Sequence, residues 1–257
     1  MDKDTNVKYK NELKKLNLKT TDDLKYLLIP LLKDAYKIIL RKKKNIPDGS
    51  NLKSHIGGQP YFEKNEMWPK AKNGKELDFV FQIFNNDSHI LPKKIKLIQF
   101  FYDFEKSTYS SKYDGQLIKI YEELDIKNIA AIKRKSKKNN VLNYCEIEYK
   151  NIKSLPVPYE IAKYDKKIEM LSCMLNKEDP WNDYLVKYEL TDGETCLYSQ
   201  IGGYADWISY NEMPKGYKFI MQIKSEKAAN LEWRIGGTMY FFYNSKSKKA
   251  KFVLQHI

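Results

Sequence analysis

The residues that could carry chemistry are few, and they lie far apart in the sequence. The three histidines, His55, His89 and His256, show no metal-ligand spacing, and no H-E-x-x-H motif is present. A serine in a G-x-S-x-G turn is also absent. We therefore predict no catalytic residue, no metal site and no cofactor. Asp87 and His89 could join His55 at a metal only if the fold brought all three together.

Two pairs of glycines could present backbone amides to an anion, because glycine accepts positive φ and allows close approach. Gly57-Gly58 and Gly202-Gly203 each follow an isoleucine. Neither pair continues into a phosphate-binding G-x-x-x-x-G-K-[ST] or G-x-G-x-x-G loop. We predict a turn or bulge beside a buried strand at both places.

Four residues are candidates for contact with a ligand or a partner: His55, Gln82, Asp103 and Gln222. His55 stands just before the first glycine pair, and Gln200 stands at the same point before the second. Loss of the imidazole from one copy could mean that the first half holds a site, or it could carry no functional meaning.

The two glutamines, Gln82 and Gln222, are each surrounded by large apolar residues, and a buried amide must find hydrogen-bond partners. We expect both side chains to be buried and bonded to the backbone. Strict alternation would place Gln82 on the strand face opposite Phe79 and Phe81. The alternative is that the glutamines line a cleft between two halves and contact a ligand.

Asp103 and Glu105 follow an apolar run, and continued alternation would put both carboxylates on one face. An exposed strand end is sufficient to explain them.

The elements that must position these residues form an internal repeat. Three segments recur in the same order and at a nearly constant separation: residues 54–58 with 199–203, 79–83 with 219–223, and 98–102 with 239–243. We predict that the strands at Phe79–Ile83 and Phe219–Ile223 are equivalent in two similar halves.

Helical patterns precede each half. Apolar residues recur at three-and-four spacing from Leu24 to Ile39, which predicts an amphipathic helix that Pro30 kinks or divides. The run Leu155–Pro158 interrupts regular structure and marks the junction, after which Tyr159–Lys187 has a mostly helical pattern. Strands are predicted near residues 77–83, 95–102, 116–121 and 144–149.

These patterns predict an α+β fold with internally duplicated, largely antiparallel β halves. We expect an N-terminal helical segment at 1–50, a first β-rich repeat at 51–155, and a helical connector with the second repeat at 156–257.

The repeated segments carry a family resemblance. The motif S-x-I-G-G-x-P-Y from Ser54, then Trp68-Pro69, then N-G-K-x-L, a strand ending in Q-I and the strand L-I-Q-F-F-Y resemble the YwqG-like family of bacterial proteins. The second half fits through I-G-G-Y-x-x-W and its own Q-I and Y-F-F strands. The resemblance covers about Ser54 to His256 and implies a duplicated α+β architecture. It implies no activity, because the family's function is unknown, although it suggests a link to bacterial conflict systems.

The charge and the cysteine content bear on the class of binding partner and on the location of the protein. The net charge of +13 suits an acidic partner, but nearly all the positive charge is lysine. Arginine, which reads phosphates and bases bidentately, occurs only at Arg41, Arg134 and Arg234, so nucleic acid is not favoured. An odd number of cysteines and the lack of a long apolar segment predict a cytoplasmic protein outside the membrane.

The favoured hypothesis is an interaction module that binds a protein partner. One alternative is an enzyme or small-molecule-binding protein that uses the cleft between the repeats, with His55, Gln82 and Asp103 as its candidate residues. The other is nonspecific binding of nucleic acid through lysines.

Overall fold

The computed structural model describes residues 3–47, 52–85, 90–104, 115–135, 142–176, 178–179, 189–191 and 198–256. The chain forms two compact units. Unit 1, the helical unit, comprises Met1–Tyr36, Asn151–Leu197 and Gly202–Trp207. Unit 2, the sheet unit, comprises Lys37–Lys150, Tyr198–Ile201 and Ile208–Ile257.

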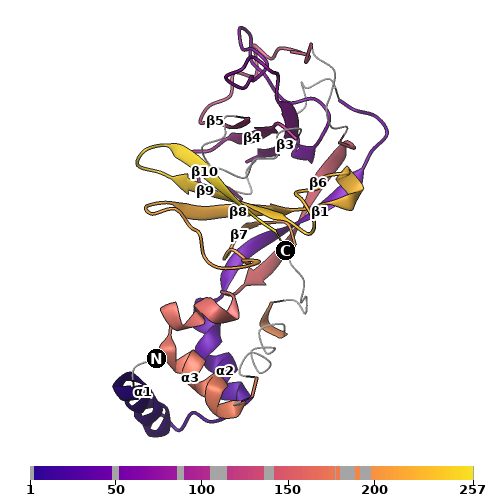
Figure 1. The fold of residues 1–257 in the computed structure, drawn as a ribbon. Coiled ribbons are helices and arrows are strands. Elements are labelled where there is room, and N and C mark those ends of the chain that lie inside the picture. The colour runs from indigo at the N-terminus through magenta and orange to yellow at the C-terminus, as the bar shows by residue number, and fades with distance from the viewer. Residues whose placement is uncertain are drawn as a thin grey trace. The chain divides into compact units, whose positions relative to one another are not determined.

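The helical unit holds short helices from two distant parts of the sequence (Figure 1). They are α1 (Lys3–Lys15), α2 (Thr21–Leu28), the 3-10 turn η1 (Ile29–Leu31), the 3-10 helix η2 (Pro158–Lys163) and α3 (Lys166–Leu175). Thr20 caps α2: its hydroxyl accepts the amide of Asp23, whose carboxylate accepts the amide of Thr20. This reciprocal capping fixes where α2 begins.

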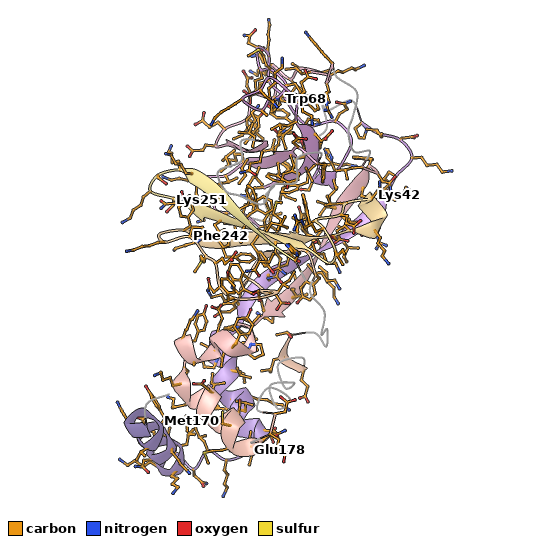
Figure 2. The ribbon with its side chains drawn as sticks, in the orientation of Figure 1. Lys42, Trp68, Met170, Glu178, Phe242 and Lys251 are labelled. Carbon is orange, nitrogen blue, oxygen red and sulfur yellow. The ribbon has the colours of Figure 1, made fainter. Side chains whose placement is uncertain are left out.

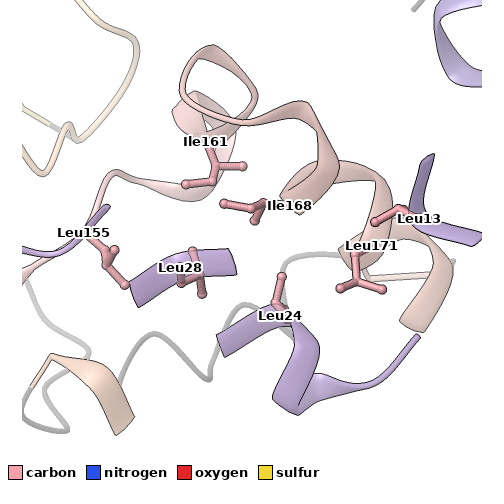
Figure 3. Packing of buried hydrophobic residues seen from close by; sticks show 7 residues of the cluster. All are labelled: Leu13, Leu24, Leu28, Leu155, Ile161, Ile168 and Leu171. Carbon is pink, nitrogen blue, oxygen red and sulfur yellow. The ribbon is translucent and has the colours of Figure 1, made fainter. Parts of the chain in front are cut away.

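Leucine and isoleucine side chains from these helices make the core of the helical unit. Figure 3 shows them spread along the space between the helices, with Leu155 from the segment before η2: Leu13, Leu24, Leu28, Leu155, Ile161, Ile168 and Leu171. Because they come from residues 13–28 and from residues 155–171, their burial holds the N-terminal helices against η2 and α3. No helix in the described part of the chain is both long and apolar enough to cross a bilayer.

The predicted helix from Leu24 to Ile39 is wrong beyond Pro30. The α-helix ends at Leu28, Pro30 lies in η1, and strand β1 runs over Lys33–Lys42. Proline has no amide to continue a helix, and the Tyr, Ile and Ile of the next segment favour a strand. The buried Ala35 and Ile38 fitted a helical spacing by coincidence.

The remaining strands belong to one ten-stranded sheet. They are β2 (His55–Ile56), β3 (Asp78–Phe84), β4 (Leu97–Tyr102), β5 (Gln116–Tyr121), β6 (Cys145–Ser154), β7 (Gln200–Gly202), β8 (Lys218–Lys224), β9 (Thr238–Asn244) and β10 (Lys249–Gln255), and a 3-10 turn, η4 (Lys227–Ala229), follows β8. The order across the sheet is β10-β9-β8-β7-β1-β6-β2-β3-β4-β5.

The predicted α+β class is therefore wrong. The described residues are largely β, with an antiparallel ten-stranded sheet and few helices. The excess of predicted helix came from two places. Residues 33–39 lie in strand β1. In Tyr159–Lys187 the described helices are only η2 and α3, and residues 180–188 lie outside the described part of the chain. The four strands predicted near residues 77–83, 95–102, 116–121 and 144–149 are confirmed as β3, β4, β5 and β6.

We take β1–β5 as the first half and β6–β10 as the second. The first strand of each half pairs with the second strand of the other half. β1 precedes β2 in the chain but pairs with β7, whereas β6 precedes β7 but pairs with β2. Equivalent backbone hydrogen bonds join the two exchanged strands to their partners. Ile38 N–H donates to Ser199 C=O at 2.8 Å, and Ile147 N–H donates to Ser54 C=O at 2.9 Å. β1 and β6 then lie side by side at the centre of the sheet, where Arg41 pairs with Glu148.

The predicted equivalence of the strands at Phe79–Ile83 and Phe219–Ile223 is confirmed by the register. In β3 and β4 the pairing shifts by a bulge between Phe79 and Phe81, and β8 and β9 have the same bulge between Phe219 and Met221. The bulge breaks the alternation on which the facing of Phe79 was predicted. Phe79 contacts Phe101, with ring centres 5.4 Å apart, and thus lies on the face of Gln82 rather than opposite it.

Aromatic rings from both halves meet on the inner face of the sheet. Phe81 and Phe100 of the first half contact Phe241 of the second, with ring centres 5.3 and 5.1 Å apart. Phe100 also contacts Phe252 of β10 at 5.5 Å. This shared core shows that the sheet curls until strands near its two ends face each other.

Candidate functional site

His55 is buried on β2 and is held by the backbone. Its Nδ1 lies 2.7 Å from the carbonyl of Gly57, so that nitrogen donates the hydrogen bond. The ring also contacts Phe79 and Tyr144. Burial lowers the pKa of His55 to about 4, so the imidazole is neutral near pH 7.

Gln82 is fully buried and bonds to the backbone, as predicted. Its oxygen accepts the amide of Tyr61 at 2.9 Å, and its nitrogen donates to Lys53 C=O at 2.8 Å. Gln99, which lies opposite Gln82 on the neighbouring strand β4, donates to Tyr61 C=O at 2.7 Å. The two glutamines therefore tie the segment around Tyr61 to the sheet.

Gln222 has the equivalent place in the second half, and its predicted burial and backbone bond are also confirmed. Its side-chain nitrogen donates to Tyr198 C=O at 2.8 Å. Gln222 on β8 lies opposite Gln200 on β7, as Gln82 on β3 lies opposite His55 on β2. Each glutamine side chain thus donates a hydrogen bond to the backbone just before the short strand that leads into the glycine pair of its own half.

Asp103 is buried, contrary to the exposed strand end expected for it. Its carboxylate accepts Nζ of Lys75 at 2.7 Å, and its side chain has no exposed surface. A second buried ion pair, between Arg134 and Asp78, lies at the same end of β3 and β4. In the second half Asn244, the last residue of β9, stands at the position equivalent to Asp103, and Lys218 stands at the position equivalent to Asp78, so neither carboxylate of this cluster is repeated there.

The structure brings only some of the predicted site residues together. His55 and Gln82 are cross-strand neighbours, whereas Asp103 follows the far end of β4 and Gln222 belongs to the second half. The Asp87, His89 and Glu105 hypotheses lie outside the described residues. Within the described ranges, no group of His, Cys, Asp and Glu side chains could hold a metal ion.

Each glycine pair forms a turn that packs closely on β1 or β6 or on a residue next to them. Gly57 and Gly58 both have positive φ, and a Cβ added to Gly58 would lie 2.7 Å from the Tyr144 ring. Gly203 is equally confined, because a Cβ there would lie 2.5 Å from the side chain of Ser154. Close packing of one backbone on another explains the glycines without an anion.

A pocket of about 460 Å³ opens on the outer face of β5. We call it the Met67 pocket; its lining is Glu66, Met67, Trp68, Pro69, Lys70 and Lys119. Met67 is 83% exposed. Trp68 is buried, donates its indole N–H to Leu77 C=O at 2.8 Å, and contacts Phe62 and Phe101. The hydrogen bond and the ring contacts therefore hold the Trp68 indole in place, whereas Met67 in the same lining is largely exposed.

An ion pair forms the inner side of the Met67 pocket. Lys119 Nζ lies 2.6 Å from Glu66 and above the rings of Phe62 and Tyr121. Tyr121 O–H donates to the same carboxylate at 2.8 Å. Burial lowers the pKa of Lys119. Burial alone would raise the pKa of Glu66, but bonds from Lys119, the Glu63 amide and Tyr121 outweigh it and lower that pKa.

Sequence reasoning missed this ion pair. One signal was available: Lys119 interrupts the apolar strand β5, and the register places Val253 of β10 at the equivalent point of the second half. Glu66 had no comparable signal, because its segment has no regular structure.

A second pocket, of about 410 Å³, lies between the two edge strands of the sheet. Its lining is Gln116, Leu117 and Ile118 of β5 with Ala250, Lys251 and Phe252 of β10. Lys248 and Glu122 join the same two strands at one end through an ion pair of 2.6 Å. We call this gap the seam; Figure 2 marks Lys251 at the seam and Trp68 at the Met67 pocket.

Comparison with known proteins adds a family but no activity. A family model described as a domain of unknown function (DUF1963) matches residues 54–252, which is most of the chain. No curated protein matches. The matched region takes in both repeats, from β2 to β10, and this family includes the YwqG-like proteins. The chain therefore belongs to the DUF1963 family of domains of unknown function.

Proposed function

We propose that this protein is an interaction module that binds a partner protein through the Met67 pocket. The single observation that carries the proposal is Met67 itself, which is 83% exposed in the lining of a pocket that also contains the buried Trp68. Methionine and aromatic residues are enriched at the centres of protein interfaces, and an unbranched thioether adapts to varied partners.

The surroundings of Met67 suit recognition better than catalysis. Lys119 and Glu66 satisfy each other, so neither presents an open acid or base to a substrate. The imidazole of His55 and the amide of Gln82, which the enzyme hypothesis required, are bonded to the backbone. Lys70 adds a cation at the rim of the pocket, where a charge steers association.

The proposal is tested by placing a photocrosslinking amino acid at Met67 and at Ile126, which is also exposed, at 62%, but lies outside the pocket lining. We expect one defined protein to crosslink from host lysate at position 67 and not at 126. With that protein purified, Met67→Asp should weaken its binding about tenfold or more without a change in Tm. Identical crosslinks at both positions, or unchanged affinity, would contradict the proposal.

A further inference from the structure

We propose that the seam between β5 and β10 binds an extended peptide segment that alternates apolar and acidic residues and pairs with the edge of β5. The inference deepens the proposed role as an interaction module, but it concerns a separate site with its own ligand chemistry.

Backbone hydrogen-bond groups point into the seam. Asp103 N–H donates to Gly115 C=O, and the register continues through the pair Phe101 and Leu117. Alternate residues of β5 thus bond to β4, and those between them, Gln116 and Ile118, direct their amides and carbonyls to the other edge. Since β5 ends the sheet in the described part of the chain, that edge has no strand partner there. An extended peptide is the ligand that such an edge recognises.

The side chains of the seam specify an alternating ligand. Ile118 pairs with Phe100, and Phe252 contacts Phe100, so both face the inner aromatic core. Lys249 and Lys251 are the exposed residues of β10 and alternate with Ala250 and Phe252. A strand entering the seam would therefore place one set of side chains on an apolar surface and the other beside lysines.

Charge selects the acidic ligand over a second copy of the chain. Lysines on an edge strand oppose pairing with another lysine-rich edge, which is how native sheets avoid aggregation. The net charge of +13 strengthens that repulsion between copies and favours an acidic segment. Lys248 and Glu122 hold the seam at one end, so the ligand would enter beside residues 116–118 and 250–252.

The test uses a short fluorescent peptide that alternates glutamate and valine. Its controls are a peptide of the same composition with the two residue types in separate blocks, and a peptide that alternates lysine and valine. We expect the first to bind the full-length protein at least about tenfold more tightly than either control, by fluorescence anisotropy, and to lose affinity as salt rises. Bound peptide should slow hydrogen exchange at the amides of Gln116 and Ile118.

Two variants check the mode of binding. Gln116→Pro removes an outward amide at the first residue of an edge strand, where proline is tolerated, and should weaken the peptide about tenfold. Lys251→Glu should weaken it similarly, whereas Lys93→Glu, an exposed change outside the seam, should not. Equal binding of the block peptide, exchange protection elsewhere, or association of the chain with itself through β5 or β10 would overturn the inference. Failure of the unmodified protein to bind the alternating glutamate–valine peptide, with intact crosslinking at Met67, would overturn the seam proposal alone.

Discussion

At the scale of single residues, the two halves differ most clearly in their buried polar groups. His55 in one half corresponds to Gln200 in the other, and both are buried beside a glutamine on the next strand. The asymmetry suggested a site in the first half, but the imidazole is used as a hydrogen-bond donor to the Gly57 carbonyl. The structure thus assigns His55 a structural contact, and the candidate site lies instead at Glu66, Met67 and Lys119.

The depressed pKa of His55 predicts an acid-sensitive fold. The folded pKa, about 4, lies below the ordinary value of 6.5, so this contribution to stability is complete above pH 6.5 and is lost as pH falls toward 4. The loss should reach about 3 kcal/mol. His55→Gln, which copies the second half, should remove that part of the pH dependence. Urea unfolding of both proteins at pH 7 and pH 4 measures it; parallel losses would show that His55 does not titrate as described.

The residue-scale predictions succeeded where burial alone decided the outcome. Gln82 and Gln222 were predicted to be buried because large apolar residues surround them, and both are. The prediction that Phe79 lies on the opposite strand face from Gln82 was wrong, because the sequence pattern does not reveal the bulge between Phe79 and Phe81. The burial of Asp103 was missed because its partner, Lys75, lies in a loop before β3.

At the scale of elements, β1 shows how one apolar pattern can fit two structures. The spacing of Ala35 and Ile38 suits a helix, and tertiary pairing with β7 and β6 makes the segment a strand. Pro30 was correctly identified as a break, but a proline that ends a helix does not determine the structure of the next segment. Strands β3, β4, β5 and β6 were predicted because short apolar or alternating runs are separated there by Gly, Pro, Asn and Asp.

The glycine turns provide a test at this scale. Gly58→Ala should destabilise the protein by about 2–4 kcal/mol, because it combines a positive φ with a Cβ only 2.7 Å from the Tyr144 ring. Gly74→Ala is the matched control: its φ is also positive, but nothing lies within 4 Å, so about 1–2 kcal/mol is expected. Thermal unfolding compares them. Equal losses would mean that close packing on the exchanged strand contributes nothing.

At the scale of the whole molecule, the exchange of β1 and β6 determines which edges remain open. Each half covers its first edge with a strand from the other half, which leaves β5 and β10 as the ends of the described sheet. The repeat in the sequence predicted two equivalent halves, but nothing in it distinguishes a strand that stays with its own half from one that crosses over. Both proposed binding surfaces lie on or beside β5, so both depend on this arrangement.

One measurement tests that arrangement directly. A protease site introduced between Lys138 and Asn139 would separate β1–β5 from β6–β10 in the covalent chain. If the halves exchange strands, the two fragments should remain together after cleavage, co-elute in size-exclusion chromatography, and separate only in denaturant. The cleaved protein should also keep its binding of the alternating glutamate–valine peptide. Fragments that separate under native conditions and remain folded individually would contradict the exchange of β1 and β6 between the halves.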